Sequence, residues 1–251
     1  MINVILLGFG NVNSHLYKAF KNSSQATVKQ VFNRSKIDLD SSSQSISFTD
    51  KISEIEEADV YIIGIPDDAI SSFSESLVLR NKLVVHTSGG AAMNVLSKNN
   101  RRGIFYPLQT FSKQREVSFK NIPICIEAEN ASDLEILQKL GETISENVTV
   151  ISSEERAKLH LAAVFVNNFT NYLYHIGGDI LNKEKLPFDL LKPLIQETAL
   201  KIETLSPKEA QTGPAKRNDV KTIEKHLNLL DDSNYRKVYE LFTDALKNNF
   251  K

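Results

Sequence analysis

Cysteine is nearly absent from this sequence, which holds a single one, Cys125, among 251 residues. A lone cysteine excludes an intramolecular disulfide, and its place in the apolar run Ile122–Ile126 indicates a buried strand residue. A reducing compartment fits this usage. The chain also opens directly on an apolar strand, without a basic leader, a hydrophobic signal core or a small-residue cleavage site. We therefore expect a cytoplasmic protein.

An excess of charge of either sign is also lacking. The formal net charge is -1, from 30 Lys and Arg against 31 Asp and Glu, and the two signs are interleaved along the chain. No basic face is available to collect the phosphates of a nucleic acid, so we expect no nucleic-acid partner.

Long apolar runs are scarce as well. One uncharged stretch, Leu159–Gly178, reaches the length of a membrane span, but its asparagines and histidines are costly in hydrocarbon. We expect a buried helix there and no membrane contact.

The first half of the chain alternates short β-rich runs with segments that can be helical. Several runs are apolar over consecutive residues and rich in Val and Ile, as a parallel strand covered on both faces requires. The pattern predicts an α/β fold with a Rossmann-type, doubly wound sheet. The expected strands are Asn3–Leu7, Val28–Phe32, Ile46–Phe48, Val60–Ile65, Leu83–His86, Ile104–Tyr106, Ile122–Glu127 and Val148–Ile151.

After about Ser152 the β signal disappears, and long helical segments follow. We expect a Rossmann domain that binds NAD(P) over residues 1–152 and an all-helical domain over residues 153–251. The serines at 41–45 indicate a surface loop. The expected helices of the second domain are Glu154–Leu181, Phe188–Leu205, Asp219–Leu230 and Ser233–Asn248.

A glycine turn follows the first strand and precedes an expected helix, Ser14–Lys21. In that context Gly8 permits a tight turn, and Gly10 lets the backbone approach a pyrophosphate that the helix N-terminus attracts. The turn predicts dinucleotide binding; the alternative is the same turn in a Rossmann-like fold that binds no nucleotide. The residues expected to contact the pyrophosphate are Gly8, Phe9, Gly10, Asn11 and Val12.

Asn13 occupies the position where a third Gly or Ala usually allows the helix to pack closely on the strand, and this departure weakens the fingerprint. Instead, we expect the Asn13 side chain to cap the helix by accepting a backbone N–H.

The end of the second strand indicates which dinucleotide binds. NAD-selective proteins place Asp or Glu about 20 residues past the glycines, where it accepts hydrogen bonds from the ribose. Here the sequence has Asn33, Arg34 and Ser35. Arg34 can pair with a 2′-phosphate or stack on adenine, and its neighbours can donate hydrogen bonds. NADP is therefore favoured over NAD; the alternative is an arginine merely exposed in a loop.

Two further strands run into polar residues at their carboxyl ends, where open α/β sheets hold their ligands. We expect Ile65, Pro66, Asp67 and Ser88 to line the cofactor site, although Asp67 can also cap a helix and Ser88 can also shape a turn. His86 ends an apolar strand. It can titrate near neutrality and donate a proton, or it is a satisfied structural imidazole.

The uncharged helix carries a polar seam. At about 100° per residue, His160, Asn167, Asn171 and His175 fall on one side, with apolar residues roughly opposite. A side that faced water would show Lys and Glu. Neutral amides and imidazoles instead indicate an enclosed cleft in which a carbonyl, imine or amide is oriented without burying a charge. The alternative is a subunit contact.

The segment 211–219 is dense in hydrogen-bonding groups and ends at Asp219, the expected cap of the next helix. We expect Thr212, Gly213 and Arg217 to contact substrate. Arg217 can form a two-pronged contact with a carboxylate, or it is a solvated loop residue.

Taken together, these motifs resemble a bacterial family with a Rossmann-like N-terminal half and a C-terminal helical domain of unknown function, whose members are labelled NADP oxidoreductases. The resemblance spans nearly the whole chain. The residues that carry it are Gly8-Phe9-Gly10-Asn11-Val12, Ile65-Pro66-Asp67-Asp68, His86-Thr87-Ser88-Gly89, Tyr106-Pro107-Leu108-Gln109-Thr110-Phe111, His160-Leu161-Ala162-Ala163, Asn168-Phe169-Thr170-Asn171 and Thr212-Gly213-Pro214.

That family is similar to pyrroline-5-carboxylate reductase, the deazaflavin-dependent NADP oxidoreductases and the 6-phosphogluconate dehydrogenase group. The resemblance implies NADP as cofactor, an eight-stranded Rossmann sheet, a helical domain of the 6-phosphogluconate dehydrogenase type and a homodimer joined through it. No residue of the sequence indicates a deazaflavin. The hydroxyacid dehydrogenases carry Lys-x-x-x-Asn on this helix, whereas His160 and Val164 stand here, so their acid-base scheme does not transfer.

These observations lead to an NADP-dependent reductase or dehydrogenase that moves a hydride between nicotinamide and a small polar substrate, an imine or carbonyl compound, held between the domains. His160 is the first candidate for the proton transfer, and His86 is the second. Asn168 and Asn171 would polarise the reacting group, and we assign no metal ligands. The alternative function is a sensor or scaffold that binds NADP without turnover.

Overall fold

The computed structural model describes residues 1–37 and 46–250, which form two compact units, Met1–Asn167 and Asn168–Lys251. The serines at 41–45, expected to form a surface loop, lie outside the described residues. The expected domain boundary after residue 152 stays a prediction. No helix in the described ranges combines the length and the apolar character needed to cross a membrane.

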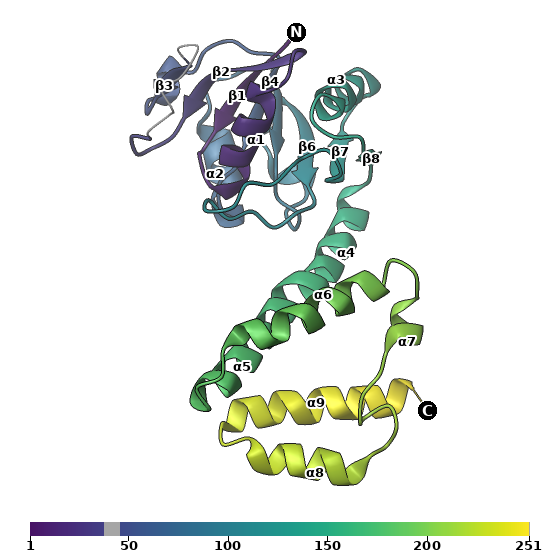
Figure 1. Cartoon of the computed structure of the whole chain (residues 1–251). Helices are drawn as coiled ribbons and strands as arrows, with labels where there is room; N and C mark the ends of the chain where they lie inside the picture. The colour runs from purple at the N-terminus through teal and green to yellow at the C-terminus, as the bar shows by residue number, and fades with distance from the viewer. Residues whose placement is uncertain (38–45, 251) are drawn as a thin grey trace. The chain divides into compact units, whose positions relative to one another are not determined.

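The first unit is built on one eight-stranded sheet with the order β3-β2-β1-β4-β5-β6-β7-β8 (Figure 1). Neighbouring strands are parallel except for β6 and β7, which are antiparallel. All eight expected strands are present, and the Rossmann-type doubly wound sheet is confirmed. The strands are β1 Ile2–Leu7, β2 Ala26–Phe32, β3 Ser47–Thr49, β4 Val60–Ile63, β5 Leu83–His86, β6 Arg101–Pro107, β7 Ile124–Ala128 and β8 Val148–Val150.

The burial of the central strands explains why runs of consecutive apolar residues predicted them correctly. Every residue of β4 and β5 is buried, so both faces of these strands need apolar side chains. β4 ends at Ile63 rather than at the expected Ile65, because its partner β1 ends at Leu7 and the pairing stops there.

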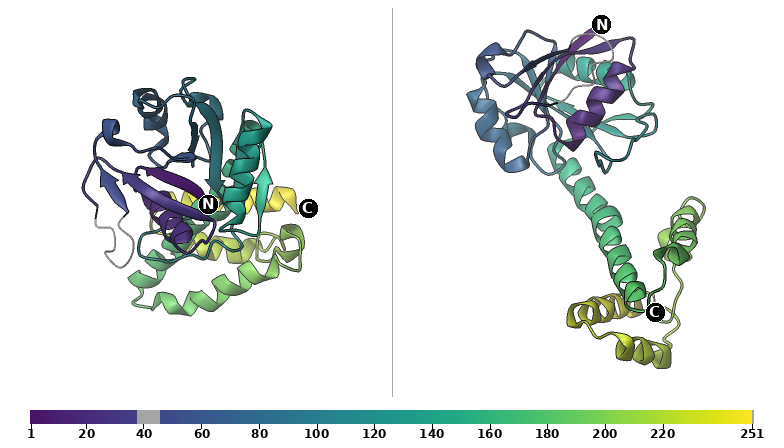
Figure 2. Two further views of the ribbon diagram at one scale, coloured as in Figure 1. Left: turned by 90° about the horizontal axis from the view of Figure 1, so that it is seen from above. Right: turned by 60° about the vertical axis from the view of Figure 1, so that its left-hand side comes forward.

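Helices cover both faces of the sheet (Figure 2). α1 (Asn11–Lys21) and α3 (Ala131–Glu142) pack on one face, and α2 (Asp67–Ser76) packs on the other. Alternate residues of β1 serve the two layers: Val4 and Leu6 join the first cluster, and Ile5 and Leu7 join the second. The glycine turn at the end of β1 is therefore held between two packed layers.

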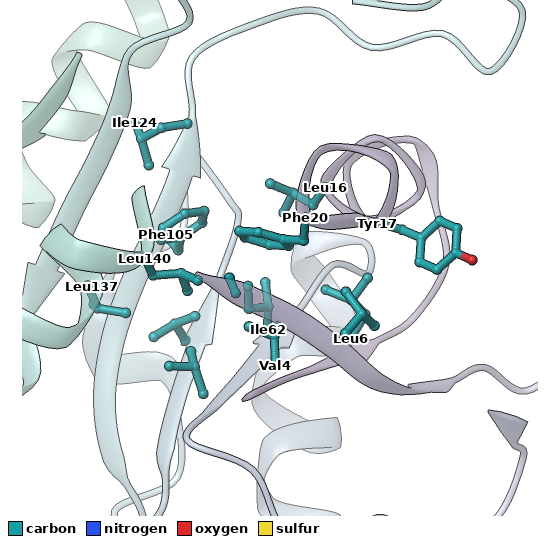
Figure 3. Close-up of a cluster of buried hydrophobic side chains, with 14 of the residues drawn as sticks. Val4, Leu6, Leu16, Tyr17, Phe20, Ile62, Phe105, Ile124, Leu137 and Leu140 are labelled. Carbon is teal, nitrogen blue, oxygen red and sulfur yellow. The ribbon is translucent and has the colours of Figure 1, made fainter. Parts of the chain in front are cut away.

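The layer beneath α1 is shown in Figure 3, where Leu16 and Phe20 point from the helix toward the strands. Both are at most 1% exposed, and the Phe20 ring lies 6.3 Å from that of Phe105 on β6. Complete burial of two large apolar side chains removes roughly 3–6 kcal/mol of unfavourable hydration. This packing holds α1 on the sheet, with its N-terminus at the carboxyl end of β1.

The long helix expected over Glu154–Leu181 consists of three helical segments. α4 (Ser153–Ala163) begins with a capping box made by Ser152 and Glu155. Residues 164–169 are π-helical, and α5 (Thr170–Lys183) follows. A π-helical turn holds more residues than an α-helical one because its hydrogen bonds run from i to i+5. The even rotation of about 100° per residue on which the expected polar seam rests is therefore interrupted.

The second unit contains α5 and further helices. Asp219 caps α8 (Val220–Leu229) as expected, because its carboxylate accepts the backbone N–H of Thr222. The helix expected over Phe188–Leu205 is shorter: a 3-10 turn at Phe188–Leu191 leads into α6, which ends at Lys201. The remaining helices are α6 Lys192–Lys201, α7 Pro207–Ala210, α8 Val220–Leu229 and α9 Ser233–Asn249.

Apolar side chains in the second unit are mostly exposed. Among its described residues only Ala215 and Ile223 are buried hydrophobics, whereas Leu194 and Leu241 are 63% and 69% exposed. No residue of α5 is buried. The burial expected for residues 159–178 is not found in the described chain, where each of these residues is exposed or half-buried.

Candidate active site

The glycine turn has the geometry that a bound pyrophosphate requires. Gly8 has φ of +86°, and a Cβ added there would lie 2.5 Å from Cγ2 of Ile65 and 2.9 Å from the carbonyl oxygen of Gly64. Only glycine adopts this conformation and fits this space without strain. The turn thus brings bare backbone to the carboxyl end of β1.

The helix that follows begins without a side-chain cap. Gly10 is the N-cap of α1, and within the described ranges no side-chain cap hydrogen bond is formed there. The first N–H groups of a helix have no partner within the helix, and they carry its positive dipole end. Such an end binds a phosphate through backbone N–H groups.

The side chains of the turn serve other purposes. Phe9 packs edge-to-face on Tyr17, and Val12 packs against the core. The Asn11 amide donates to the carbonyl oxygen of Phe111 at 3.0 Å. If these residues contact a pyrophosphate as predicted, they do so through backbone atoms, because their side chains are engaged elsewhere.

Asn13 does not cap the helix, and that expectation is wrong. Its side chain is fully buried and donates to carbonyl oxygens of Leu7, Gly8 and Ile62 at 3.3, 2.8 and 3.2 Å. The space for it exists because residue 64, opposite, is a glycine. The close packing that a third glycine usually gives to the helix is here provided by Gly64 after β4.

A cavity of about 730 Å³ opens beside the glycine turn. Arg34 and Asn33 line it from the end of β2, and Ile65 and Pro66 line it from the end of β4. The contacts of these four residues with a cofactor stay predictions. Ser35 is exposed nearby but is not among the lining residues. One wall of the cavity was not predicted from the sequence. It is formed by Phe32 and by Asp68, Ala69, Ser72, Phe73 and Ser76 of α2.

Spacing could have revealed this wall, since positions 69, 72, 73 and 76 share one face of a helix.

Asn33 has a structural task as well. Its Oδ1 accepts the N–H of Phe9 at 3.1 Å, and its Nδ2 donates to the carbonyl oxygen of Ser35 at 2.8 Å. The end of β2 is thereby tied to the glycine turn. Arg34, which is exposed, remains as the cation at this end of the cavity.

These residues fit an adenine dinucleotide with a 2′-phosphate. At Gly8 the backbone turn has no room for a Cβ, and the N-terminus of α1 has no side-chain cap. After β2 the cavity is lined by the guanidinium of Arg34 rather than by a carboxylate. A carboxylate at that place would accept ribose hydroxyls and repel a phosphate, whereas a guanidinium pairs with it.

Asp67 and Ser88 meet at the neighbouring strand ends. The Ser88 hydroxyl donates to Oδ2 of Asp67 at 2.7 Å and accepts the N–H groups of Gly90 and Ala91. Pro66, not Asp67, is the N-cap of α2. The pair therefore holds the loop after β5 in a fixed shape, and the cofactor contacts expected for both residues stay predictions.

His86 does not titrate near neutrality, and that part of its expected role is wrong. The side chain is fully buried, and burial lowers its pKa to about 4. Its Nδ1 accepts the N–H of Ser88 at 3.2 Å, which leaves Nε2 to donate to the carbonyl oxygen of Ala92 at 3.3 Å. His86 is neutral at pH 7 and holds the same loop.

His160 lies beside that loop. Its Nδ1 is 3.3 Å from the hydroxyl oxygen of Tyr106 on β6, and the two rings meet edge-on. A Cβ at Gly89 would lie 2.5 Å from this nitrogen and 2.8 Å from Cζ of Tyr106. The absence of a side chain at Gly89 therefore allows the imidazole to rest on the loop.

Arg156 fixes the helix that carries His160. This arginine is fully buried, pairs with Glu127 on β7 at 2.7 Å and donates to the carbonyl oxygen of Ala91. Position 156 is one helical turn before position 160 on the same face. The loop 86–92 therefore contacts α4 at two places: Arg156 bonds the carbonyl oxygen of Ala91, and His160 packs against Gly89.

The other predicted site residues belong to the second unit. Asn171 and His175 line a hollow of about 550 Å³ between α5 and α6. Thr212 and Gly213 line a separate apolar cavity of about 370 Å³ between α5 and α9. Arg217 lines neither cavity. The contacts of Asn168, Asn171, Thr212, Gly213 and Arg217 with substrate stay predictions.

Comparisons with known proteins place this arrangement in a family. A family model described as a domain of unknown function (DUF2520) matches residues 122–246. A solved structure from Bacteroides fragilis, described as a "putative NADP oxidoreductase", is 39% identical, covers 98% of this chain and 98% of its own, and has a TM-score of 0.88. The chain belongs to the DUF2520 family. This confirms the resemblance seen in the sequence.

Two more distant structures share the fold of this family member. Pyrroline carboxylate reductase of Plasmodium falciparum, solved with NADP bound, is 14% identical, with a TM-score of 0.60 over 100% of this chain and 97% of its own. An imine reductase of Myxococcus stipitatus in complex with NADP⁺ is also 14% identical, with a TM-score of 0.58 over 98% and 92%. A comparison with curated proteins gave no match.

Proposed function

We propose that this protein is an NADP-dependent oxidoreductase that transfers a hydride between the nicotinamide and an imine or carbonyl group of a small polar substrate. The observation that carries the proposal is the pairing of a bare glycine cradle with Arg34 in one cavity of about 730 Å³. The label of the Bacteroides relative and the NADP bound by the two distant structures support it.

Different residues of the cavity would bind different parts of the cofactor. Backbone N–H groups at the start of α1 would hold the pyrophosphate, and the Arg34 guanidinium would pair with the 2′-phosphate. Ala69, Ser72 and Phe73 would border the adenosine. When bound, the cofactor supplies the hydride chemistry, and the protein orients the reactants.

The proposed catalytic groups are His160 on α4 of the first unit and two asparagines, Asn168 and Asn171, of the second. His160 would donate a hydrogen bond to the reacting oxygen or nitrogen while the hydride is transferred, and the proton that completes a reduction would come from solvent. Asn168 and Asn171 would polarise the reacting group through their amides. His86, neutral and buried, would support this arrangement by holding the loop 86–92 rather than by giving a proton.

Titration with NADPH and NADH, followed by cofactor fluorescence, tests the proposal. We expect NADPH to bind more tightly, and we expect Arg34→Ala to weaken NADPH binding about tenfold or more with little effect on NADH, since a charged hydrogen bond contributes about 1.5–3 kcal/mol. Arg80→Ala is the matched control, because Arg80 precedes β5 at the amino end of that strand, whereas the cavity lies at the carboxyl ends of β1, β2 and β4, and Arg80 does not line it. No binding of either nucleotide at millimolar concentration would refute the proposal.

A metabolite screen for NADPH oxidation separates an enzyme from a sensor. We expect turnover with at least one imine, ketone or aldehyde, and its loss in His160→Ala with nucleotide binding intact. Binding without oxidation across these substrate classes would favour a protein that senses NADP.

We also propose a homodimer joined through the helical unit. Leu190, Leu194 and Leu241 are between 62% and 69% exposed in the single chain, and so much apolar surface on a small unit indicates a partner. Light scattering coupled to size-exclusion chromatography should give twice the chain mass. Leu194→Glu should yield a monomer, whereas Val78→Glu, at an equally exposed site of the first unit, should not. A monomeric wild-type protein would refute this proposal.

A further inference from the structure

The hydroxyl of Tyr106 and Nδ1 of His160 form an isolated hydrogen-bonded pair. The two atoms are 3.3 Å apart, and within residues 1–37 and 46–250 this hydroxyl has no other hydrogen-bond partner. Tyr106 is 9% exposed and packs among Ile104 and Cys125. A hydroxyl so placed needs an acceptor for its hydrogen, and Nδ1 is the acceptor that the protein offers.

The chemistry of the two groups allows the hydroxyl to be the donor in this bond. Burial raises the pKa of Tyr106, so the phenol keeps its hydrogen at neutral pH. A neutral imidazole carries one hydrogen, and the nitrogen that accepts a hydrogen bond cannot carry it. If Tyr106 donates to Nδ1, the ring hydrogen is on Nε2. No protein group in the described ranges bonds Nε2.

The surroundings hold the ring in place. Gly89 leaves just enough room for the two side chains, since its missing Cβ would overlap Nδ1 of His160. On the helix side, Arg156 ties α4 to Glu127 and to the carbonyl oxygen of Ala91. The ring is therefore positioned by the loop below it and by the helix that carries it.

We propose that Tyr106 is a positioning residue that holds His160 in the tautomer with hydrogen on Nε2, so that His160 meets the substrate as a hydrogen-bond donor. This inference rests on the proposed function and narrows its substrate class. A fixed donor stabilises charge that develops on an accepting atom, as on a carbonyl oxygen or a neutral imine nitrogen. An iminium ion, which itself carries the N–H, would be disfavoured.

The tautomer can be measured without substrate or cofactor. Two-bond ¹H–¹⁵N correlation spectra of the imidazole rings, taken where the His160 signals no longer move with pH, report which nitrogen carries the hydrogen. We expect hydrogen on Nε2 in the wild type. In Tyr106→Phe we expect the Nδ1 resonance to move toward the value of a non-bonded nitrogen, with the other tautomer becoming visible.

Tyr61→Phe is the matched control, because it also removes a buried tyrosine hydroxyl from the sheet. That hydroxyl accepts the N–H of Ala58 and donates to the carbonyl oxygen of Glu56, so its loss should leave the His160 signals unchanged. Gly89→Ala is a second variant, which should displace the pair while both side chains remain. Hydrogen on Nδ1 in the wild type, or unchanged His160 signals in both Tyr106→Phe and Gly89→Ala, would overturn the inference.

Kinetics extend the test once a substrate is in hand. We expect Tyr106→Phe to lower the single-turnover rate about tenfold while the Kd for NADPH stays within twofold. The loss is smaller than the roughly 100-fold or more for removal of a donor, because His160 remains and loses only its fixed orientation. Failure of NADPH to bind would refute the proposed function and leave the tautomer result standing. An unchanged rate in Tyr106→Phe would overturn the positioning role and leave the proposed function intact.

Discussion

Asn13 on α1 packs directly against Gly64, the residue after β4: a Cβ at Gly64 would lie 2.4 Å from Cγ of Asn13. The asparagine donates to three carbonyl oxygens at the ends of β1 and β4, so it joins the helix to both strands. The two residues are complementary, because one supplies the amide and the other supplies the room for it.

This pairing predicts a non-additive effect of mutation. Asn13→Ala should lower the free energy of unfolding by about 1–3 kcal/mol, since buried carbonyl oxygens lose their donor. Gly64→Ala should cost at least as much, because the new methyl group overlaps the amide. In the double variant the overlap is gone, so urea denaturation should show less destabilisation than the sum of the two. Strict additivity would contradict the relationship.

Gly8→Ala should disturb the glycine turn directly. The residue has a positive φ, and its new Cβ would overlap Ile65 and Gly64. We expect a loss of about 1–3 kcal/mol in stability and a larger loss in NADPH affinity, because the backbone must move away from the pyrophosphate. Gly213→Ala is the control for backbone strain alone, since φ is +112° there and nothing lies within 4 Å. Equal NADPH affinity in Gly8→Ala and wild type would contradict the cradle.

The buried pair of Arg156 and Glu127 should show coupling. Arg156→Met leaves the Glu127 carboxylate, 18% exposed, without its guanidinium and should destabilise by about 3–5 kcal/mol. Adding Glu127→Gln removes the stranded charge, so the double variant should recover part of that loss. Thermal unfolding of the four proteins measures the coupling, and a double variant less stable than Arg156→Met would argue against it.

His86 should make stability depend on pH. Its pKa in the folded protein is about 4, mainly because burial disfavours the charged ring, against 6.5 for an ordinary histidine. Between these values the unfolded chain binds more protons, so stability falls as the pH drops from about 6.5 to about 4, by roughly 3 kcal/mol in total. His86→Gln should flatten this part of the profile in urea denaturation. A slope that is the same in both proteins would contradict the assignment.

The parts of this molecule that sequence predicts are those with local causes. The β-rich runs follow from the need for apolar side chains on both faces of β4 and β5, and the glycine turn follows from its place between a strand and a helix. The cap at Asp219 is local too, because its donor lies three residues away at Thr222.

The misjudged features depend on residues far apart in the chain. Asn13 takes its role from strand ends that include Ile62, 49 positions away, and from the glycine at 64. His86 is kept neutral by burial in the fold, which its own strand does not reveal. The π-helical segment 164–169 leaves no local mark in the sequence, so the expected rotation of the polar seam could not be corrected beforehand.

The bond between Asn33 and the N–H of Phe9 has a consequence for changing nucleotide preference. A carboxylate introduced at position 33 would still accept from Phe9, but it could no longer donate to the carbonyl oxygen of Ser35. A hydrophobic residue there would release the phosphate-binding loop itself. A change of preference toward the unphosphorylated nucleotide should therefore begin at position 34. The side chain there can be exchanged without breaking the hydrogen bond that ties the end of β2 to the glycine turn.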